Sequence, residues 1–124
     1  SDPAVYLNLA VIYYRSKQYV EALTNCQRAL DLDPDALRAH QIVGRVAFDS
    51  GEHEEAARAY LSALRLDPDD ADTHRGLAST REALGEGEAA IRHWQRWLEL
   101  VGEDPARQAE ADRVRQRLKD LIDS

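Results

Sequence analysis

The sequence predicts an all-α protein, a solenoid of stacked antiparallel helix pairs, and three observations lead to this fold class. The stretches CQRALDLDPDA (26–36) and YLSALRLDPDD (60–70) are nearly alike and lie 34 residues apart. Apolar and small residues recur at the same step along most of the chain. Halfway between the repeated motifs, a short polar break interrupts the apolar pattern. A fixed period of this length is typical of stacked repeats, in which each unit is one supersecondary element.

Each unit is expected to hold two helices of about a dozen residues joined by a short turn. Gly51 and Gly85 occupy the matching turn position, where glycine adopts a positive φ at no steric cost. Proline biases the preceding residue away from helical angles, so Pro34 and Pro68 end their units, whereas the third unit ends at Val101-Gly102. The turns are the polar stretches RSKQY (15–19), DSGEH (49–53) and LGEGE (84–88). The predicted units span 3–36, 37–70 and 71–104.

Small and large residues alternate in the same order in every unit. Small residues on both helices would let each pair approach closely, and larger residues would fill the grooves between helices. The small positions are Ala10, Gly44 and Ala78 on the first helices and Ala22, Ala56 and Ala90 on the second. The core-filling positions four residues after the second set are Cys26, Tyr60 and Trp94.

The tail, residues 105–123, is predicted to form a helix that caps the stack. Asp104 can cap this helix and Pro105 suits its first turn. The apolar stripe consists of Ala111, Val114, Leu118, Leu121 and Ile122. Trp97 replaces the small residue of the earlier units, so we expect it to fill space beneath the tail. The alternative is that Trp97, Trp94 and the tail stripe form an interface patch, because aromatic residues are enriched at interface cores.

The order of these residues resembles the tetratricopeptide repeat. The first unit carries the pattern as Tyr6, Leu9, Ala10, Tyr13, Ala22, Cys26 and Pro34. The second keeps Val43, Gly44, Ala56, Tyr60, Ala63 and Pro68, and the third keeps Leu77, Ala78, Ala90 and Trp94. The third unit departs with Arg81 at the tyrosine position and Trp97 at an alanine position. The resemblance covers 3–104 and implies a right-handed superhelix that binds proteins without catalysis, as an adaptor or scaffold.

Composition excludes several function classes. The formal net charge of −7 argues against a nucleic-acid binder and against docking on anionic lipid. No apolar run is long enough for a membrane span.

The single cysteine, Cys26, forms no internal disulfide and stands at a core position, where an inert thiol is expected. The chain has no methionine, so we expect a fragment or processed form. A cytoplasmic protein is favoured, and an exported or periplasmic one stays open.

No residue pattern indicates an enzyme, a cofactor or a metal site. The run GEGE (85–88) is expected to be a helix–helix turn, and the carboxylates show no paired arrangement for acid–base catalysis. His40 and His74 stand at the same position of successive units, which could indicate a metal pair. Because neither a cysteine nor a third histidine is near, we interpret both as packing residues. His53 and His93 are expected at the surface.

The family resemblance implies that the first helices line a concave surface where extended peptides bind. We expect Arg38, Arg45 and Arg75 to hold carboxylates, since arginine forms forked hydrogen bonds to them. Tyr14, Ile42 and Phe48 would bury apolar side chains. The full predicted groove set is Asn8, Val11, Tyr14, Arg38, Gln41, Ile42, Arg45, Phe48 and Arg75. The alternative is that Asp49 and Asp72 neutralise Arg45 and Arg75 along their own helices.

The expected partner is a protein or peptide, with acidic or C-terminal carboxylate groups as the favoured chemistry. One known mode within the family clasps the acidic C-terminus of cytosolic chaperones with lysine, asparagine and arginine side chains. The matching positions here are Leu7, Val11, Ile42, Asp72 and Gly76, so that clamp is absent. Two alternatives stay open: a structural homo-oligomer built end to end or through the tail, and the docking or regulatory part of a larger enzyme.

Overall fold

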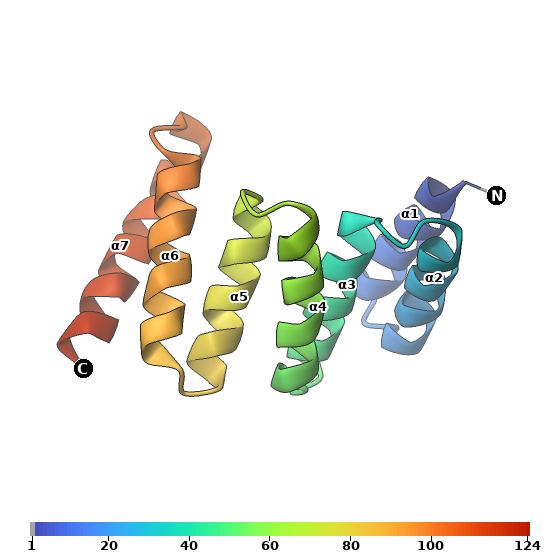
Figure 1. Ribbon diagram of the computed structural model, residues 1–124, viewed down its shortest axis with the longest axis horizontal. Helices are drawn as coiled ribbons and strands as arrows, with labels where there is room; N and C mark the ends of the chain where they lie inside the picture. The colour runs from blue at the N-terminus through green and yellow to red at the C-terminus, as the bar shows by residue number, and fades with distance from the viewer. Residues whose placement is uncertain (1) are drawn as a thin grey trace.

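The computed structural model describes residues 2–124, and every element in this range is helical. Figure 1 shows the helices following one another along the long axis, with the N-terminus and α7 at opposite ends. The all-α solenoid predicted from the sequence is confirmed. Across the described residues, no helix is both long and apolar enough to cross a bilayer. The pairs are α1 (Pro3–Arg15) with α2 (Tyr19–Leu32), α3 (Leu37–Asp49) with α4 (His53–Leu66), and α5 (Ala71–Ala83) with α6 (Gly87–Val101); η1 (Pro105–Arg107) and α7 (Gln108–Asp123) follow.

The turn inside each pair has the same geometry. Lys17, Gly51 and Gly85 have positive φ angles of 60°, 78° and 76°. The next amide in each turn reaches back five residues: Gln18 N–H donates to the Tyr13 carbonyl, and Glu52 and Glu86 do the same to Ala47 and Arg81, at 2.8–2.9 Å. This is the bond that closes a helix at a left-handed residue. The polar breaks therefore form the same turn three times, with lysine taking the glycine position in the first.

The loops between pairs are also repeated. Asp33 and Asp67 end α2 and α4, and each side chain accepts a hydrogen bond from the amide two residues on, at 3.0 Å. His40 Nε2 donates to the Pro34 carbonyl at 3.2 Å, and His74 Nε2 donates to the Pro68 carbonyl at 2.7 Å. The two histidines thus tie each proline loop to the helix that follows, which agrees with a packing role.

The small residues lie where the paired helices touch: the alanines at positions 10, 22, 56, 78 and 90 are fully buried. Cys26, Tyr60 and Trp94 are buried at the core-filling positions. Burial raises the pKa of the Cys26 thiol to about 11, so the thiol stays protonated and unreactive at neutral pH, as a core cysteine should. The alternation of small and large residues therefore builds the core of each pair.

The C-terminal helix covers the last pair. Asp104 accepts a hydrogen bond from Ala106 N–H at 3.0 Å, with Pro105 in the first turn, as predicted. Trp97 is completely buried among the apolar residues of α7, so the interpretation of Trp97 as an interface residue is wrong. Ile122 is 59% exposed and lies outside the buried stripe, contrary to the prediction. The buried stripe is Ala111, Val114 and Leu118, with Leu121 packed at its edge.

Candidate functional site

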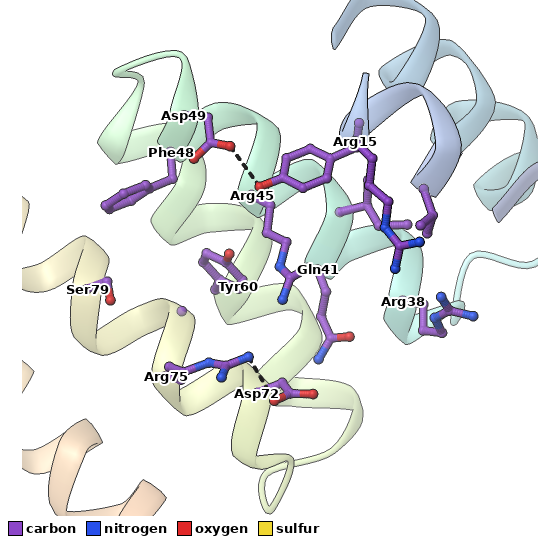
Figure 2. A pocket seen from close by; sticks show the side chains of 14 residues that line it. Arg15, Arg38, Gln41, Arg45, Phe48, Asp49, Tyr60, Asp72, Arg75 and Ser79 are labelled. Atoms are coloured by element: carbon purple, nitrogen blue, oxygen red, sulfur yellow. Dashed lines mark hydrogen bonds and ion pairs between the residues drawn. The ribbon is translucent and has the colours of Figure 1, made fainter. Parts of the chain in front are cut away.

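The first helices of the three pairs surround a hollow of about 390 Å³. Its walls come from α1, α3 and α5, and Tyr60 of α4 contributes from behind (Figure 2). Asn8 does not line the hollow; its side chain is exposed elsewhere on α1. The structure brings together the other members of the predicted groove set: Val11, Tyr14, Arg38, Gln41, Ile42, Arg45, Phe48 and Arg75.

Three arginines present guanidinium groups to the hollow without a carboxylate partner. Arg15, Arg38 and Arg45 are exposed, and no ion pair within 4.0 Å involves any of them in residues 2–124. Asp49, which could have neutralised Arg45, instead accepts a hydrogen bond from the Tyr14 hydroxyl at 2.7 Å. Burial and this bond raise the pKa of Tyr14 to about 12, so its proton stays in place. The alternative of an Arg45–Asp49 pair is therefore wrong.

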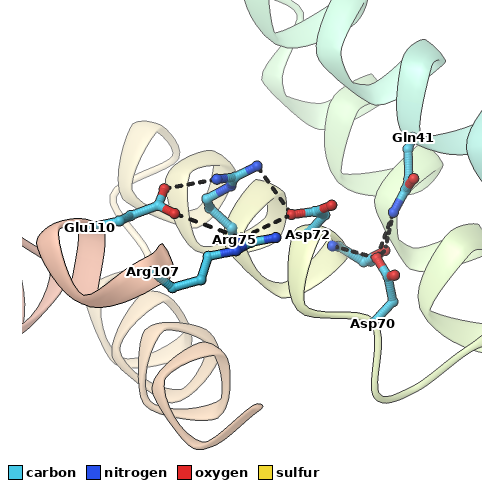
Figure 3. A network of polar contacts seen from close by, with 7 residues as sticks. Gln41, Asp70, Asp72, Arg75, Arg107 and Glu110 are labelled. Carbon is cyan, nitrogen blue, oxygen red and sulfur yellow. Dashed lines mark hydrogen bonds and ion pairs between the residues drawn. The ribbon is translucent and has the colours of Figure 1, made fainter. Parts of the chain in front are cut away.

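Arg75 differs from these three because the chain already neutralises it. Its Nη1 lies 2.7 Å from Glu110 Oε2 of α7, and its Nη2 lies 3.2 Å from Asp72 Oδ1 (Figure 3). Arg107 approaches both carboxylates at 3.7 Å. The alternative proposed from the sequence, pairing of Arg75 with Asp72, is thus realised. Arg75 lines the hollow as part of an internal network and is not a free cation.

Gln41 and Ile42 also have structural roles. Gln41 Nε2 donates to Asp70 Oδ2 at 2.6 Å and to Thr73 Oγ1 at 3.0 Å (Figure 3). Asp70 caps α5 by accepting from Thr73 N–H at 2.9 Å, so this amide fixes α3 to the start of the next pair. Ile42 is buried in the core shared by α1, α2 and α3 and offers little surface to a ligand.

The predicted groove set did not include Tyr60 or Arg15, although the helical spacing places Arg15 on the concave side of the first helix. The Tyr60 ring passes between Gly44 of α3 and Gly76 of α5, and it reaches the floor of the hollow. A Cβ built at Gly44 or Gly76 would lie 2.8 Å or 2.5 Å from ring atoms, so only glycine leaves room for the ring. Burial raises the pKa of Tyr60 to about 12. The coincidence of two glycines on adjacent first helices was the sequence signal for this ring.

A second hollow of about 490 Å³ adjoins the first, toward α7. The two share Phe48 and Ser79 as walls, and we call them together the groove. Trp94 Nε1 donates to Glu82 Oε2 at 2.6 Å, and Arg117 of α7 pairs with the same carboxylate. The apolar part of the wall is formed by Phe48, Trp94 and Val114.

The two parts of the groove differ in charge. The first hollow carries the guanidinium groups of Arg15, Arg38, Arg45 and Arg75 against the carboxylates of Asp49 and Asp72. This local excess of positive charge lies in a chain whose net charge is −7. In the second hollow, Glu82 and Glu110 are each paired with an arginine, and the charges of Arg113 and Arg117 balance those of the two carboxylates. An anionic group is therefore attracted to the first hollow and an apolar group to the second.

The histidines do not assemble into a larger cluster. Within residues 2–124, no three His, Cys, Asp or Glu side chains are placed to hold a metal ion together. His74 Nδ1 lies 3.1 Å from His93 Nδ1, and His93 is half-buried. His53 is half-buried against Phe48, with the ring centres 4.9 Å apart. The prediction of surface positions for His53 and His93 is wrong, because both rings pack on the preceding first helix.

Comparisons with known proteins agree with this architecture. A model of the tetratricopeptide repeat family matches residues 2–69, and a second model of that family matches 44–107. The type III secretion chaperone SycD of Yersinia enterocolitica, solved with a peptide of the translocator YopD, is similar with a TM-score of 0.89 at 21% identity. That match covers 96% of this chain and 91% of SycD.

Two further solved structures resemble the chain. The first tetratricopeptide repeat domain of Spaghetti (RPAP3), bound to an HSP90 peptide, has a TM-score of 0.82 at 20% identity, over 96% of this chain and 99% of that one. An O-GlcNAc transferase of Thermobaculum terrenum has a TM-score of 0.78 at 28% identity, over 82% of this chain and 19% of the transferase. At these identities, the likenesses to SycD and RPAP3 show the fold alone.

Proposed function

The chain belongs to the tetratricopeptide repeat family, and we propose that it is a noncatalytic interaction module that binds a peptide or helix of a partner protein in the groove. One observation carries this proposal: Arg15, Arg38 and Arg45 converge on one hollow with no carboxylate partner in residues 2–124. Unpaired guanidinium groups at a concave surface are suited to bind carboxylates. The peptide complexes of SycD and RPAP3 support the same kind of partner.

The two hollows suggest which side chains the partner supplies. Arg38 and Arg45 would bind carboxylates of the partner through forked hydrogen bonds, each contributing about 1.5–3 kcal/mol. An apolar side chain of the partner would lie against Phe48 and enter the second hollow beside Trp94 and Val114. We therefore expect a partner segment with an acidic part and, next to it, a bulky apolar residue.

This mode differs from the clamp that holds acidic chaperone tails in other family members. The five clamp positions are Leu7, Val11, Ile42, Asp72 and Gly76, and none provides the required cation or amide. The absence of a side chain at Gly76 is explained by the Tyr60 ring, which occupies that space. The cations of this groove lie instead at Arg15, Arg38 and Arg45, so a different peptide is expected.

A second role is favoured by one comparison. The Thermobaculum terrenum O-GlcNAc transferase contains a segment similar to this chain that makes up 19% of its length. The module would then be the docking part of a larger enzyme, and it would still act by binding a segment of another protein. The groove is the binding surface in both roles.

The proposal is tested by selecting peptides on the chain from a random display library and measuring their Kd by fluorescence anisotropy. Arg38→Glu and Arg45→Glu should each weaken binding about 10- to 100-fold, since each replaces an attraction by a repulsion. The affinity of the unaltered chain should fall as salt is added, because exposed charges are screened. Selected peptides should be rich in Asp or Glu.

Arg65→Glu is the matched control. Arg65 is exposed on α4, outside the groove, and its only hydrogen bond in the described range is to Ser62 Oγ. This variant changes the net charge by the same amount and should bind as the unaltered chain does. Equal Kd values for Arg38→Glu, Arg45→Glu and Arg65→Glu would exclude the arginine hollow as the carboxylate site.

A further inference from the structure

The hydroxyl of Tyr60 is a polar group for which the chain supplies no acceptor. The side chain is only 5% exposed, and it lines the first hollow. Within residues 2–124, this O–H donates to no acceptor within 3.5 Å. A buried tyrosine hydroxyl normally has a hydrogen-bond partner. Because the ring reaches the floor of the hollow, a bound molecule can supply the acceptor.

Two glycines hold the hydroxyl end of this ring in place. The ring atoms nearest to a Cβ built at Gly44 or Gly76 include Cζ, at 2.8 Å and 2.5 Å, and Cζ carries the hydroxyl. The glycines of α3 and α5 therefore let this end of the ring pass from α4 into the hollow (Figure 2). A polar group that packing has already fixed loses little freedom when a ligand binds, which favours a binding role.

The third helix pair contains the hydrogen bond that the second pair lacks. Trp94 stands 34 residues after Tyr60, and its Nε1–H donates to Glu82 Oε2 at 2.6 Å. Glu82 lies on the first helix of that pair, and the residue 34 positions before it is Phe48, whose side chain has no acceptor. The third pair thus supplies a carboxylate for its buried aromatic donor, whereas the second pair leaves the donor open to the hollow.

The charges around the Tyr60 hydroxyl favour an anionic acceptor. Burial is the largest cause that raises the pKa of Tyr60 to about 12, whereas the positive charges of Arg45 and Arg75 act in the opposite direction. Guanidinium groups only donate, so neither can accept the phenol proton. The nearby Asp49 carboxylate accepts from Tyr14. A carboxylate oxygen at this point would accept from the hydroxyl and be attracted by both arginines.

We propose that Tyr60 binds one carboxylate of the partner: one oxygen accepts the Tyr60 O–H at the floor of the first hollow, and Arg45 donates to the other oxygen. This inference rests on the proposed peptide binding in the groove, and it specifies which carboxylate reaches the floor. Arg38 binds a different carboxylate, because it lies more than one helical turn before Gly44, which flanks the Tyr60 ring.

The helices α3 and α5 place this carboxylate relative to the second hollow. Phe48 and Ser79, the walls that both hollows share, lie about one turn beyond Gly44 and Gly76. The carboxylate on Tyr60 is therefore bound beside the shared walls. We expect it to belong to the acidic residue nearest to the partner's apolar residue.

The test is Tyr60→Phe, which removes the hydroxyl and keeps the ring between the two glycines. An acidic peptide selected on the unaltered chain should bind this variant about 10-fold more weakly, because a hydrogen bond to a charged group is lost. Urea denaturation should give an unchanged free energy of unfolding, since the O–H has no acceptor in the described part of the chain. Tyr13→Phe is the matched control, because Tyr13 is half-buried on α1 and lines neither hollow. It should bind the peptide as the unaltered chain does.

Peptide variants identify the carboxylate that Tyr60 binds. Each Asp or Glu of the selected peptide is replaced in turn by Asn or Gln, and the Kd of each variant is measured with the unaltered chain and with Tyr60→Phe. For one position, the acidic residue nearest to the apolar one, the effect of Tyr60→Phe should largely disappear, because the two changes remove the same hydrogen bond. For the other acidic positions the effect should remain about 10-fold.

Equal Kd values for Tyr60→Phe and the unaltered chain would overturn this inference. If Arg45→Glu still weakens binding in the same assay, the proposed peptide binding stands without the Tyr60 contact. A loss in Tyr60→Phe that persists with every peptide variant also overturns the inference, since it would not depend on a carboxylate. If neither Arg38→Glu nor Arg45→Glu changes the Kd, the proposed carboxylate binding and this inference both fail.

Discussion

The fold of the third pair opposes protonation of His93. This ring on α6 is half-buried, and its Nδ1 lies 3.1 Å from His74 Nδ1 on α5. Burial is the largest cause that lowers the pKa of His93 to about 4, and the charges of His74, Arg81 and Arg92 act in the same direction. The folded chain therefore keeps this imidazole neutral at pH values where an unfolded chain would protonate it.

This shift predicts a loss of stability in mild acid. Above about pH 6.5 neither state binds the proton; as the pH falls toward 4, only the unfolded state binds it, so the free energy of unfolding decreases. The decrease assigned to His93 is at most about 3 kcal/mol. It is measured by urea denaturation across this pH range for the unaltered chain and for His93→Gln, which keeps a donor for His74. As the pH falls, the free energy of unfolding of His93→Gln should decrease less than that of the unaltered chain. Identical pH profiles of the two proteins would contradict the buried, neutral state of His93.

At the scale of single residues, the sequence predicted where a residue lies in the fold better than which other residue it contacts. Arg45 could be placed on the inner side of α3 by its spacing, and Cys26 could be placed in the core by the repeat. The partner of Asp49 could not be predicted, because Arg45 is one helical turn away and Tyr14 is 35 residues away. Only the packing of α1 against α3 decides in favour of Tyr14. Asn8 was misplaced for the same reason: helical spacing gives a side of the helix, and packing decides which residues on that side face the hollow.

At the scale of the elements, Tyr60 links three helices. Its ring extends from α4 between Gly44 of α3 and Gly76 of α5. Glycine inside a helix costs up to about 1 kcal/mol relative to alanine, so two such residues beside one ring indicate a steric requirement. The spacing of α3 and α5 along the groove therefore depends on this contact.

We predict that Gly76→Ala lowers the free energy of unfolding by about 1–3 kcal/mol, although alanine favours helix formation. The reason is the 2.5 Å approach of the added Cβ to the Tyr60 ring. In a Tyr60→Leu background the same change should be neutral or stabilising, and urea denaturation of all four proteins measures the coupling. Gly87→Ala is the control, because no atom lies within 4 Å of a Cβ at that position. Additive effects of Gly76→Ala and Tyr60→Leu would contradict the steric account.

The elements themselves were largely predictable. The turn stretches, the proline stops and the Asp104 cap are local signals, and each appears in the structure where the sequence placed it. The end of the tail stripe was not predictable, since Leu121 and Ile122 have equal apolar character. In the folded chain Ile122 lies in solvent and Leu121 lies at the edge of the core.

At the scale of the whole molecule, the 34-residue period was sufficient to predict the stacked arrangement. It was not sufficient to predict the second hollow, whose walls combine Phe48 of α3, Trp94 of α6 and Val114 of α7. These residues meet because α7 packs beside α5, with Glu110 and Arg117 paired to Arg75 and Glu82. Such pairs join segments that no local pattern connects.

The proposed peptide binding is tested most directly by NMR, with a selected acidic peptide titrated into the isotopically labelled chain and the amide shifts followed. We predict that the largest shifts map to the inner sides of α1, α3 and α5, around Arg15, Arg38 and Arg45, and continue past Phe48 toward Val114. Amides on the outer sides of α2 and α4 should change little. Shifts concentrated on those outer helices, with the groove residues unaffected, would contradict the account.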